Sequence, residues 1–415
     1  MEKVFSKYGL DEFDCIGYCD FENFDTPVGL LYDEFKDIVL AACNDSVFCF
    51  NICELTSDPG RFIRKGDEKE LMSVNDNKIN FGKSVKFGGN IRSIKKSRWG
   101  GMEANTDNKD KSESACMENY VIVNRKNYPI IVTDFGLRTI STIHVKNSKD
   151  ELENIFSVDF VLDANKSEST MLFGCKNRIY LSDFRNPKQV SCINLKQKTL
   201  DEKSNIKHQK GIVSSLSVKT KGIGCFSIFS SGTFSGSIFL HDLKNSDSQI
   251  KIFDSEIEMN GITELYWLED PHYHENIEYH LVSGDRRNEM FYIWDVRKPN
   301  KVLCKIEREN GEIDQRFIMC FNINKDSISN EFKLDIFSGD SNGNLNNVKL
   351  YFEYEEKKLK NETISLRKYS IDNKSIPFID INKSKNILLT LSGARTLELD
   401  SKCTFKLWNL NLLNN

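Results

Sequence analysis

The chain has 415 residues, enough for about two or three domains or for one large repeat array. Apolar residues make up 39% of it, enough to build a packed core, and no apolar run approaches the ~20 residues of a membrane-spanning helix. Lys and Arg (57) nearly balance Asp and Glu (61) for a net charge of −4, which excludes a histone-like or ribosomal-type basic protein but allows a local basic patch.

The first residues and the cysteines both bear on the compartment of the protein. The opening segment, MEKVFSKYGLDEFDC, is charged and has no apolar h-region, so we expect no secretory signal. The 12 cysteines include no Cys-x-x-Cys pair, and most are scattered among apolar residues. This pattern predicts reduced, mostly buried thiols in a nuclear or cytosolic protein.

One local pattern occurs seven times along the chain. Each copy has a short apolar strand, a small-residue turn, and a second alternating strand that ends in an aromatic or apolar residue followed by Asp or Asn. In chain order the copies are 38–52, 120–135, 171–184, 226–243, 280–296, 333–351 and 386–410. The alternation predicts strands, and the turn residues suit hairpins. Little helical periodicity is present, so the repeats predict an all-β fold.

The ends of the second strands are typical of WD-repeat propellers. Trp294-Asp295 is the intact signature, and Trp408-Asn409 and His241-Asp242 stand at the corresponding positions of two other copies. In the unit that ends at His241, Ser235 occupies the place of the turn Asp and His241 that of the Trp. We therefore predict a seven-bladed WD-repeat β-propeller with eroded repeats and long polar loop insertions.

We expect this propeller to be a single domain over residues 1–415. The predicted blades lie near 27–55, 91–135, 155–190, 211–245, 261–300, 313–351 and 376–410. Residues 56–90 and 100–117 are polar and predict two loop insertions. Residues 1–20 are expected to supply the outer strand that closes the ring, because closure removes an open sheet edge.

Motifs of known chemistry are missing from the sequence. There is no nucleophile elbow, Walker loop, His-Glu-x-x-His or paired-cysteine zinc pattern. Gly82-Lys83-Ser84 lacks the upstream glycine of a phosphate loop. His272, His274 and His280 could hold a metal, but no cysteine or carboxylate spacing supports a fixed geometry, and solvated loop histidines explain them better. We expect no catalytic residue, no metal and no cofactor.

The candidate binding residues are basic side chains placed in predicted turns. The turns between second and third strands of a propeller, and the connections into first strands, open on one face. The basic residues in these positions are Arg125, Lys176, Arg178, Arg286, Arg287 and Arg316. Converging guanidinium groups could hold phosphates as bidentate forks. The alternative is that they are solvated turn residues, or that they pair with acids such as Asp285 and Asp314.

The stretch from Lys83 to Trp99 mixes lysines and arginines with Phe87 and Trp99. Basic and aromatic residues together suit single-stranded RNA, which stacks its bases as well as pairing its charge. Within it, Lys95-Lys96-Ser97-Arg98 fits a weak nuclear import signal. The alternative, which we favour, is one strand over Ile91–Trp99 with a solvated loop.

The order of the blades resembles the WD-repeat family of the telomerase Cajal body protein, closest to its budding-yeast splicing-associated members. Arg125, Pro129-Ile130 and Asp134 are similar to that family's second blade, and Lys210-Gly211-Ile212-Val213-Ser214 to the start of its fourth. Trp294-Asp295-Val296-Arg297 resembles its fifth blade and Gln315-Arg316 its sixth. The resemblance runs in order over roughly residues 27–350.

The resemblance implies a non-enzymatic nuclear scaffold for pre-mRNA splicing, which associates with and stabilises the U1 small nuclear ribonucleoprotein at 5′ splice site recognition. The implied partners are small nuclear ribonucleoprotein components or small nuclear RNA, with protein partners on the blade faces and no membrane. One alternative is a carrier of small Cajal body or telomerase RNA. A remote alternative is a WD-repeat methylesterase, which would need a water-activating Asp or His in the central channel.

Overall fold

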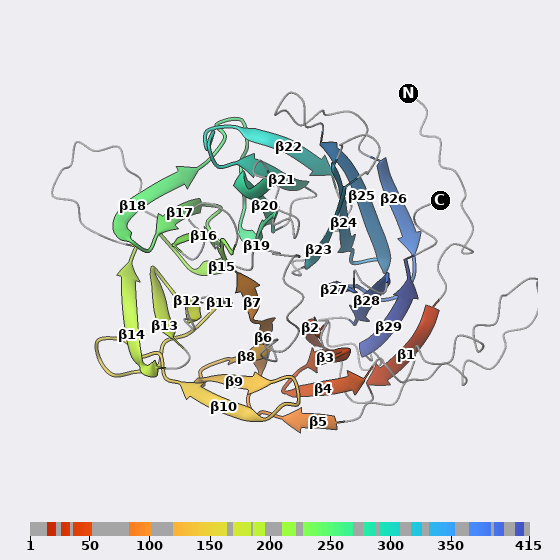
Figure 1. The fold of residues 1–415 in the computed structure, drawn as a ribbon, viewed down its shortest axis with the longest axis horizontal. Helices are drawn as coiled ribbons and strands as arrows, with labels where there is room; N and C mark the ends of the chain where they lie inside the picture. Colours follow the sequence, from red (N-terminus) through yellow and green to blue (C-terminus); the bar gives the residue numbers. More distant parts are fainter. Residues whose placement is uncertain are drawn as a thin grey trace, which may run out of the picture.

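The computed structural model describes residues 15–21, 26–33, 36–51, 83–100, 119–163, 169–183, 186–195, 210–220, 227–268, 277–286, 290–307, 317–325, 332–352, 365–382, 386–393 and 403–410. The strands of these residues form seven sheets, arranged as blades around a central axis (Figure 1). The only helical element of the described residues is the short 3-10 helix η3 (Ile277–Tyr279). The prediction of an all-β, seven-bladed propeller is therefore confirmed.

The blades follow one another in chain order. Blade 1 consists of β2 (Pro27–Asp33), β3 (Ile38–Cys43), β4 (Ser46–Asn51) and β5 (Lys83–Lys86). Blade 2 consists of β6 (Ile91–Lys96), β8 (Tyr120–Arg125), β9 (Ile130–Asp134) and β10 (Thr139–Ile143). Blade 3 consists of β11 (Ser157–Asp163), β12 (Ser169–Gly174), β13 (Arg178–Asp183) and β14 (Asn186–Asn194). Blade 3 also includes β7 (Arg98–Gly100).

The remaining four blades have the same plan. Blades 4 and 5 consist of β15 (Val213–Val218), β16 (Ile228–Thr233), β17 (Ile238–Asp242) and β18 (Asn245–Ile252), and of β19 (Ile262–Trp267), β20 (His280–Asp285), β21 (Met290–Asp295) and β22 (Val302–Glu307). Blades 6 and 7 consist of β23 (Met319–Lys325), β24 (Phe332–Gly339), β25 (Asn344–Phe352) and β26 (Ser365–Ser370), and of β27 (Phe378–Asn382), β28 (Ile387–Ser392), β29 (Cys403–Asn409) and β1 (Cys15–Phe21).

Each blade runs antiparallel from its own first strand outward, and that strand is innermost in every blade except blade 3 (Figure 1). Blade 7 takes its outer strand from the other end of the chain, because β1 pairs antiparallel with β29 from Cys15 opposite Trp408 to Phe21 opposite Cys403. The ring is thus joined by hydrogen bonds between its two ends.

The outer strands differ from the predicted unit ranges. The ranges 27–55, 91–135, 211–245, 261–300 and 313–351 stop before the outer strand of their blade or at its first residue. These strands are short or partly exposed, so their apolar alternation is weak in the sequence. Residues 83–90 of the expected insertion 56–90 hold β5 and its connection to β6. Residues 56–82 and 101–117 lie outside the described part of the chain.

A second difference concerns the single strand expected from Ile91 to Trp99. The structure has two strands there, because β6 stays in blade 2 whereas β7 crosses to blade 3. β7 pairs parallel with β11, with Arg98 opposite Val161. The sheet of blade 3 therefore gains a fifth strand on the side nearest the axis, as Figure 1 shows.

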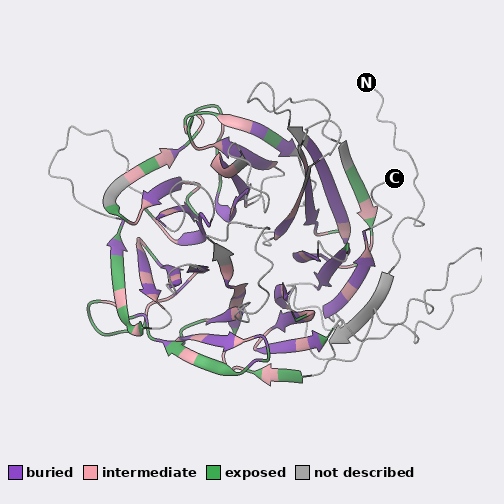
Figure 2. Cartoon of the chain, viewed as in Figure 1, coloured by how far each residue is buried: buried purple, intermediate pink, exposed green. Residues whose placement is uncertain are grey.

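The core consists of the seams between neighbouring blades. Seven clusters of buried apolar side chains lie in the described part of the chain, one between each pair of adjacent blades. At the seam between blades 7 and 1, the rings of Phe50 and Phe405 stack with centroids 5.1 Å apart. Figure 2 shows the buried residues concentrated on the inner strands, whereas outer strands such as β10 and β14 carry exposed residues.

Most of the described cysteines are buried in the core. Among the described cysteines, none forms a disulfide, and Cys43, Cys175, Cys304, Cys320 and Cys403 are buried. Burial raises the pKa of Cys304 to about 11, so its thiol stays protonated at neutral pH. No helix in the described residues is long and apolar enough to span a membrane.

The same kind of hydrogen bond ties the third strand to the second in blades 4, 5 and 7. The indole Nε1 of Trp294 donates to Ser283 Oγ over 2.9 Å in blade 5, and that of Trp408 donates to Thr390 Oγ1 over 2.9 Å in blade 7. In blade 4 the corresponding bond joins His241 Nε2 and Ser231 Oγ over 2.6 Å. His241 therefore occupies the place of the repeat Trp and keeps its hydrogen bond.

The environment of His241 favours its neutral form. Its ring is buried and stacks on Phe229, with centroids 4.6 Å apart. Nδ1 has no hydrogen-bond partner among the described residues, so a proton on Nε2 leaves only an acceptor unpaired. Burial lowers the pKa of His241 to about 3.

The inner edges of the first strands are held by side chains from other blades. In blade 1, the N–H of Tyr32 donates to Asp380 Oδ2 over 2.9 Å, and its carbonyl accepts from Lys96 Nζ over 2.8 Å. A sheet edge at the axis has no further strand to pair with, so these charged groups satisfy backbone atoms that would otherwise lack partners. Tyr32 thereby links blades 7, 1 and 2.

The same arrangement recurs at Val218 in blade 4. Its N–H donates to Asp159 Oδ2 over 2.7 Å, and its carbonyl accepts from Arg98 Nη2 over 2.8 Å. The two side chains also pair with each other, with Arg98 Nη2 2.5 Å from Asp159 Oδ2. Because Asp159 is fully buried, this ion pair compensates a charge that water cannot reach.

We predict that His241 makes the protein less stable in acid. The unfolded chain takes up this proton below about pH 6.5, whereas the native state does so only near pH 3. The free energy of unfolding therefore decreases as the pH is lowered through that window, by up to about 1.4 kcal/mol per pH unit. Urea titrations should show a shallower pH dependence for His241→Phe than for the wild type. A slope equal to that of the wild type would contradict the prediction, and the exposed His144→Phe is the control.

We also predict that the pair of Arg98 and Asp159 is strongly coupled. Arg98→Met should lower the free energy of unfolding by about 3 kcal/mol, because it leaves a buried carboxylate without its counter-charge. The double variant Arg98→Met/Asp159→Asn should recover part of this loss, because the amide oxygen still accepts from Val218. Urea denaturation of the single and double variants measures the coupling. Strictly additive losses would mean that the pair does not act as one unit.

Candidate partner-binding rim

One face of the ring gathers two kinds of connection. They are the turns between second and third strands, and the segments that lead from an outer strand to the next blade; both lie at the same end of antiparallel sheets. We call this face the rim. The described residues of its turns between second and third strands are 44–45, 126–129, 175–177, 234–237, 286, 340–343 and 393.

The rim turns press against the segments that follow them. Gly236 has φ 78, and a Cβ there would lie 1.9 Å from the carbonyl oxygen of Met259. Gly343 also has φ 78, and its Cβ would lie 2.1 Å from the carbonyl oxygen of Asp372. Only glycine fits both the conformation and the space. These contacts hold the turns in place, so the rim is a rigid surface.

Asp285 of blade 5 binds the backbone of the segment that leads from blade 4 to blade 5. This buried carboxylate, at the end of β20, accepts from the backbone N–H of Asn260 over 2.9 Å and of Gly261 over 2.7 Å. The N–H of Arg286 donates in turn to the Gly261 carbonyl over 2.6 Å. The carboxylate of Asp285 therefore holds the backbone of this segment.

Arg125, at the end of β8, is used inside the rim. Its guanidinium donates to the carbonyls of Phe87 (2.6 Å), Gly88 (3.3 Å) and Pro129 (3.2 Å). It also lies over the ring of Tyr128, 5.0 Å from the centroid. Burial lowers its pKa, but an arginine remains charged at neutral pH. Arg125 thus fastens the turn of blade 2 to the connection from blade 1.

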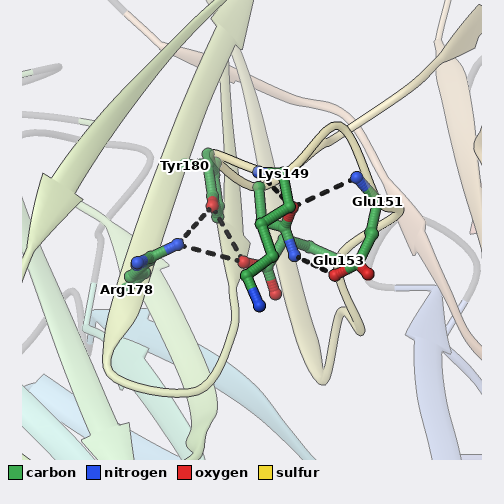
Figure 3. Close-up of polar contacts among 6 residues, drawn as sticks. Lys149, Glu151, Glu153, Arg178 and Tyr180 are labelled. Carbon is green, nitrogen blue, oxygen red and sulfur yellow. Dashed lines mark hydrogen bonds and ion pairs between the residues drawn. The ribbon is translucent and has the colours of Figure 1, made fainter.

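Arg178, at the start of β13, has local partners too. Figure 3 shows Arg178 and Tyr180 pointing towards Glu153 of the connection between blades 2 and 3. Arg178 Nη1 lies 3.3 Å from Glu153 Oε1, and the Tyr180 hydroxyl donates to the same oxygen over 3.0 Å. Burial raises the pKa of Tyr180 to about 12, which keeps this hydroxyl protonated. Arg178 therefore joins two neighbouring parts of the rim.

The connection from blade 2 to blade 3 is ordered by its own side chains. Asn147 Oδ1 accepts from the N–H of Lys149 over 2.8 Å and of Glu151 over 3.1 Å (Figure 3). Lys146 pairs with Asp150 over 2.8 Å, but both are well exposed, so this pair adds little stability. The loop that carries Glu153 is thus held in shape by its own hydrogen bonds.

The side chains of Lys176 and Arg286 make contacts of a different kind from those of Arg125 and Arg178. Lys176 is exposed, and its backbone forms a bridge to Ile212. The Arg286 guanidinium lies over the ring of Phe234, 5.7 Å from the centroid, and so joins blades 4 and 5. Arg287 and Arg316 lie outside the described residues.

The rim therefore collects the four described candidates on one face, as the strand order predicts, but each has different local partners. Arg125 and Arg178 hold carbonyls and a carboxylate, so they are structural. Two exposed rings escaped the sequence reasoning: Tyr128 is 49% exposed and Phe234 is 42% exposed. The signal available for them was a large aromatic residue at a turn tip, where small polar residues are the rule.

Basic side chains of the stretch 83–99 make contacts between blades. Arg92 Nη1 donates to the Ile155 carbonyl over 2.9 Å, and the ammonium of Lys95 lies 5.6 Å from the Tyr266 ring centroid in blade 5. Together with Lys96 and Arg98 they tie inner strands of different blades. In place of the one strand expected over Ile91–Trp99 the structure has β6 and β7, and residues 87–90 connect β5 to β6. The side chains of Lys96 and Arg98, which belong to the expected import signal at 95–98, take part in these contacts between blades.

The metal question can be put to the described residues alone. They contain no group of three or more His, Cys, Asp or Glu side chains placed to hold a metal. His280 is buried within β20, whereas His272, His274 and Gly82 lie outside the described part. Lys83 and Ser84 belong to β5, a strand, so they are not followed by the helix of a phosphate loop.

Comparison with known proteins gives a fold but no sequence relative. No family profile and no curated protein matches the sequence. In fold, 870 chains of solved structures match. One belongs to the crystal structure of a mitotic checkpoint complex, with a TM-score of 0.56 and 12% identity, covering 99% of this chain and 96% of that chain. The chain folds as a WD40-type β-propeller. Such propellers serve many functions, so the likeness at this identity assigns no partner.

We predict that Arg125 is structural and Lys176 is not. Arg125→Lys should lower the free energy of unfolding by about 2 kcal/mol, because one ammonium cannot replace a fork that reaches three carbonyls. Lys176→Ala should change it by less than about 0.5 kcal/mol, as expected for an exposed side chain. Chemical denaturation measures both. An Arg125→Lys variant as stable as the wild type would show that the fork is dispensable.

Proposed function

We propose that this chain is a non-catalytic nuclear scaffold of pre-mRNA splicing. In this proposal it associates with the U1 small nuclear ribonucleoprotein, stabilises it at 5′ splice site recognition, and binds its partners on the rim. The observation that carries the binding role is the rim itself, a rigid set of turns that presents exposed rings and cations from several blades. The fold neighbour in the mitotic checkpoint complex supports assembly with other proteins in general.

The use of polar groups near the axis supports a non-catalytic role. Asp159 is committed to Arg98 and Val218, and the buried Glu264 accepts from the Tyr266 hydroxyl over 2.5 Å. His241 is neutral in a blade seam and hydrogen-bonds Ser231. A general base needs a substrate proton within hydrogen-bond distance, and these groups already make hydrogen bonds or ion pairs within the protein.

A scaffold of this type would act through binding alone. Contacts that exist only in one assembled state of a ribonucleoprotein lower the free energy of that state and raise its population. The required differential affinity is modest, since about 1.4 kcal/mol changes an equilibrium tenfold. A rigid rim serves this purpose well, because little side-chain and loop entropy is lost on binding.

The splicing assignment is supported by the ordered resemblance over roughly residues 27–350, in which Arg125, Trp294-Asp295 and Gln315-Arg316 take part. Nuclear localisation belongs to the same proposal. It does not depend on Lys95–Arg98, whose side chains are engaged between blades.

Affinity purification of the tagged full chain from nuclear extract tests this function. We expect enrichment of U1 RNA by sequencing and of U1 proteins by mass spectrometry, with RNase showing which contacts run through RNA. The rim variant Lys176→Glu/Arg286→Glu should reduce the recovery. Arg138→Glu, an exposed charge in the turn between β9 and β10 on the opposite face, is the matched control.

Two outcomes would overturn the proposal. Enrichment of small Cajal body or telomerase RNA in place of U1 would favour the carrier function. A purification without any small nuclear RNA or its proteins would remove the splicing role and leave a propeller with other partners.

A further inference from the structure

The outer strands of the seven blades are the open sheet edges of this molecule. Among the described strands, each outer strand pairs only with the strand on its inner side, so that its other edge is unpaired. A row of unpaired backbone N–H and C=O groups is a template for a further strand from another chain. Proteins commonly prevent such pairing with charged side chains on the edge, above all lysine, or with proline.

Six of the seven outer strands contain a charged residue of this kind. β5, β14, β18, β22 and β26 each have a lysine that is exposed or partly exposed, and the sequence of β1 contains Asp20. The lysines are Lys83, Lys188, Lys251, Lys305 and Lys368. Most of the circumference of the ring is therefore protected against the addition of a strand.

The outer strand of blade 2 is the exception. β10 has the sequence Thr-Ile-Ser-Thr-Ile, which contains no charged residue and no proline and is rich in β-branched residues that favour strands. Thr139, Ile140 and Thr142 are exposed, and Figure 2 shows β10 at the outside of the ring. No described strand pairs with its outer edge. β10 therefore combines an open edge with side chains suited to pairing.

A bulge is a further device that turns an edge away from partners, and β10 has one. Its register to β9 shifts between Thr139 and Ser141. Similar shifts occur at the outer strands of blades 3, 4, 5 and 7, where they come in addition to a charged residue. From Ser141 to Ile143 the pairing to β9 is regular. β10 thus has less protection than these strands and a regular second half.

The sequence of β10 is complementary to a second copy of itself. In an antiparallel pair that overlaps the whole strand, Ser141 lies opposite Ser141 of the second copy, and Ile140 lies opposite Thr142. Cross-strand pairs of β-branched residues stabilise a sheet, and no charges oppose one another within the strand. The charge just before β10, on Arg138, has a counter-charge in Asp134 3.7 Å away. Two copies can therefore approach without a repelling charge on the edge.

We propose that the chain forms a two-fold homodimer in which β10 pairs antiparallel with β10 of a second copy, so that the two copies of blade 2 become one continuous sheet. The observations favour a second copy as the occupant, because an edge that is open in one copy is open in the other and the two have the same uncharged sequence. The pairing uses the circumference of the ring and none of the rim turns, so it does not depend on the proposed function (Figure 1).

Sedimentation equilibrium of the purified full chain tests the dimer. The mass should rise from the 47.8 kDa of one chain towards that of two as the protein concentration increases. Thr142→Lys gives β10 the kind of residue that the other outer strands carry, and it should raise the dissociation constant of the dimer by about tenfold or more. Ile250→Lys is the matched control, because Ile250 is 49% exposed on β18, which already contains Lys251, and this variant should dimerise as the wild type does.

Disulfide cross-linking tests the register. Directly opposed residues of antiparallel strands have their Cα atoms about 4.5 to 5.5 Å apart, which suits a disulfide. Ser141→Cys should therefore form a cross-linked dimer on mild oxidation. Thr139→Cys should not, because the two copies of residue 139 are offset by four residues, or about 13 Å along the strands. The wild type gives the background from Cys192, which is exposed.

Three results would each overturn the homodimer. They are a monomer at every concentration, a Thr142→Lys variant that dimerises as the wild type does, and equal cross-linking by the two cysteine variants. None of them bears on the recovery of U1 components from extract, so the scaffold function and the homodimer stand or fall separately.

Discussion

The pairing of β1 with β29 is the contact on which the rest of the molecule depends. It gives blade 7 its fourth strand and turns a row of seven sheets into a ring. Without it, blade 7 would expose an open edge near the end of the chain, where a partner strand could pair. Closure also brings blades 7 and 1 together, so that the stacked rings of Phe50 and Phe405 fill the last seam. Each blade then buries both of its faces.

Closure places the first strands at the axis. Among the described residues only β11 has a further strand, β7, on its inner edge. The chain meets this constraint with charged side chains from other blades. Tyr32 is held by Asp380 and Lys96, and Val218 by Asp159 and Arg98. These residues account for charge near the axis that would suggest a catalytic or nucleic-acid site if only the residue types were considered. Their contacts make the inner ring rigid, which in turn positions the rim.

The charged residues of the rim differ in how far they are engaged. Arg125 and Arg178 join neighbouring segments of the rim, Arg286 lies over the ring of Phe234, and Lys176 is exposed. This difference explains why a binding surface can be built on a chain of nearly balanced charge. Affinity for a polyanion depends on a few placed cations, and not on the net charge of the protein.

The sequence by itself determined the class of fold. Alternation of apolar residues is a local property with a period of two, and its sevenfold repetition predicts seven blades and the strand that closes them. Even the substitution of His241 for a repeat Trp could be placed in the sequence. The outer strand β5 and the crossing of β7 could not, because their few residues carry little alternation. Only the tertiary structure decided which basic side chains are available. Arg178 of blade 3 meets Glu153 of the connection from blade 2, and Arg98 meets Asp159 and Val218. No local pattern specifies partners so distant along the chain.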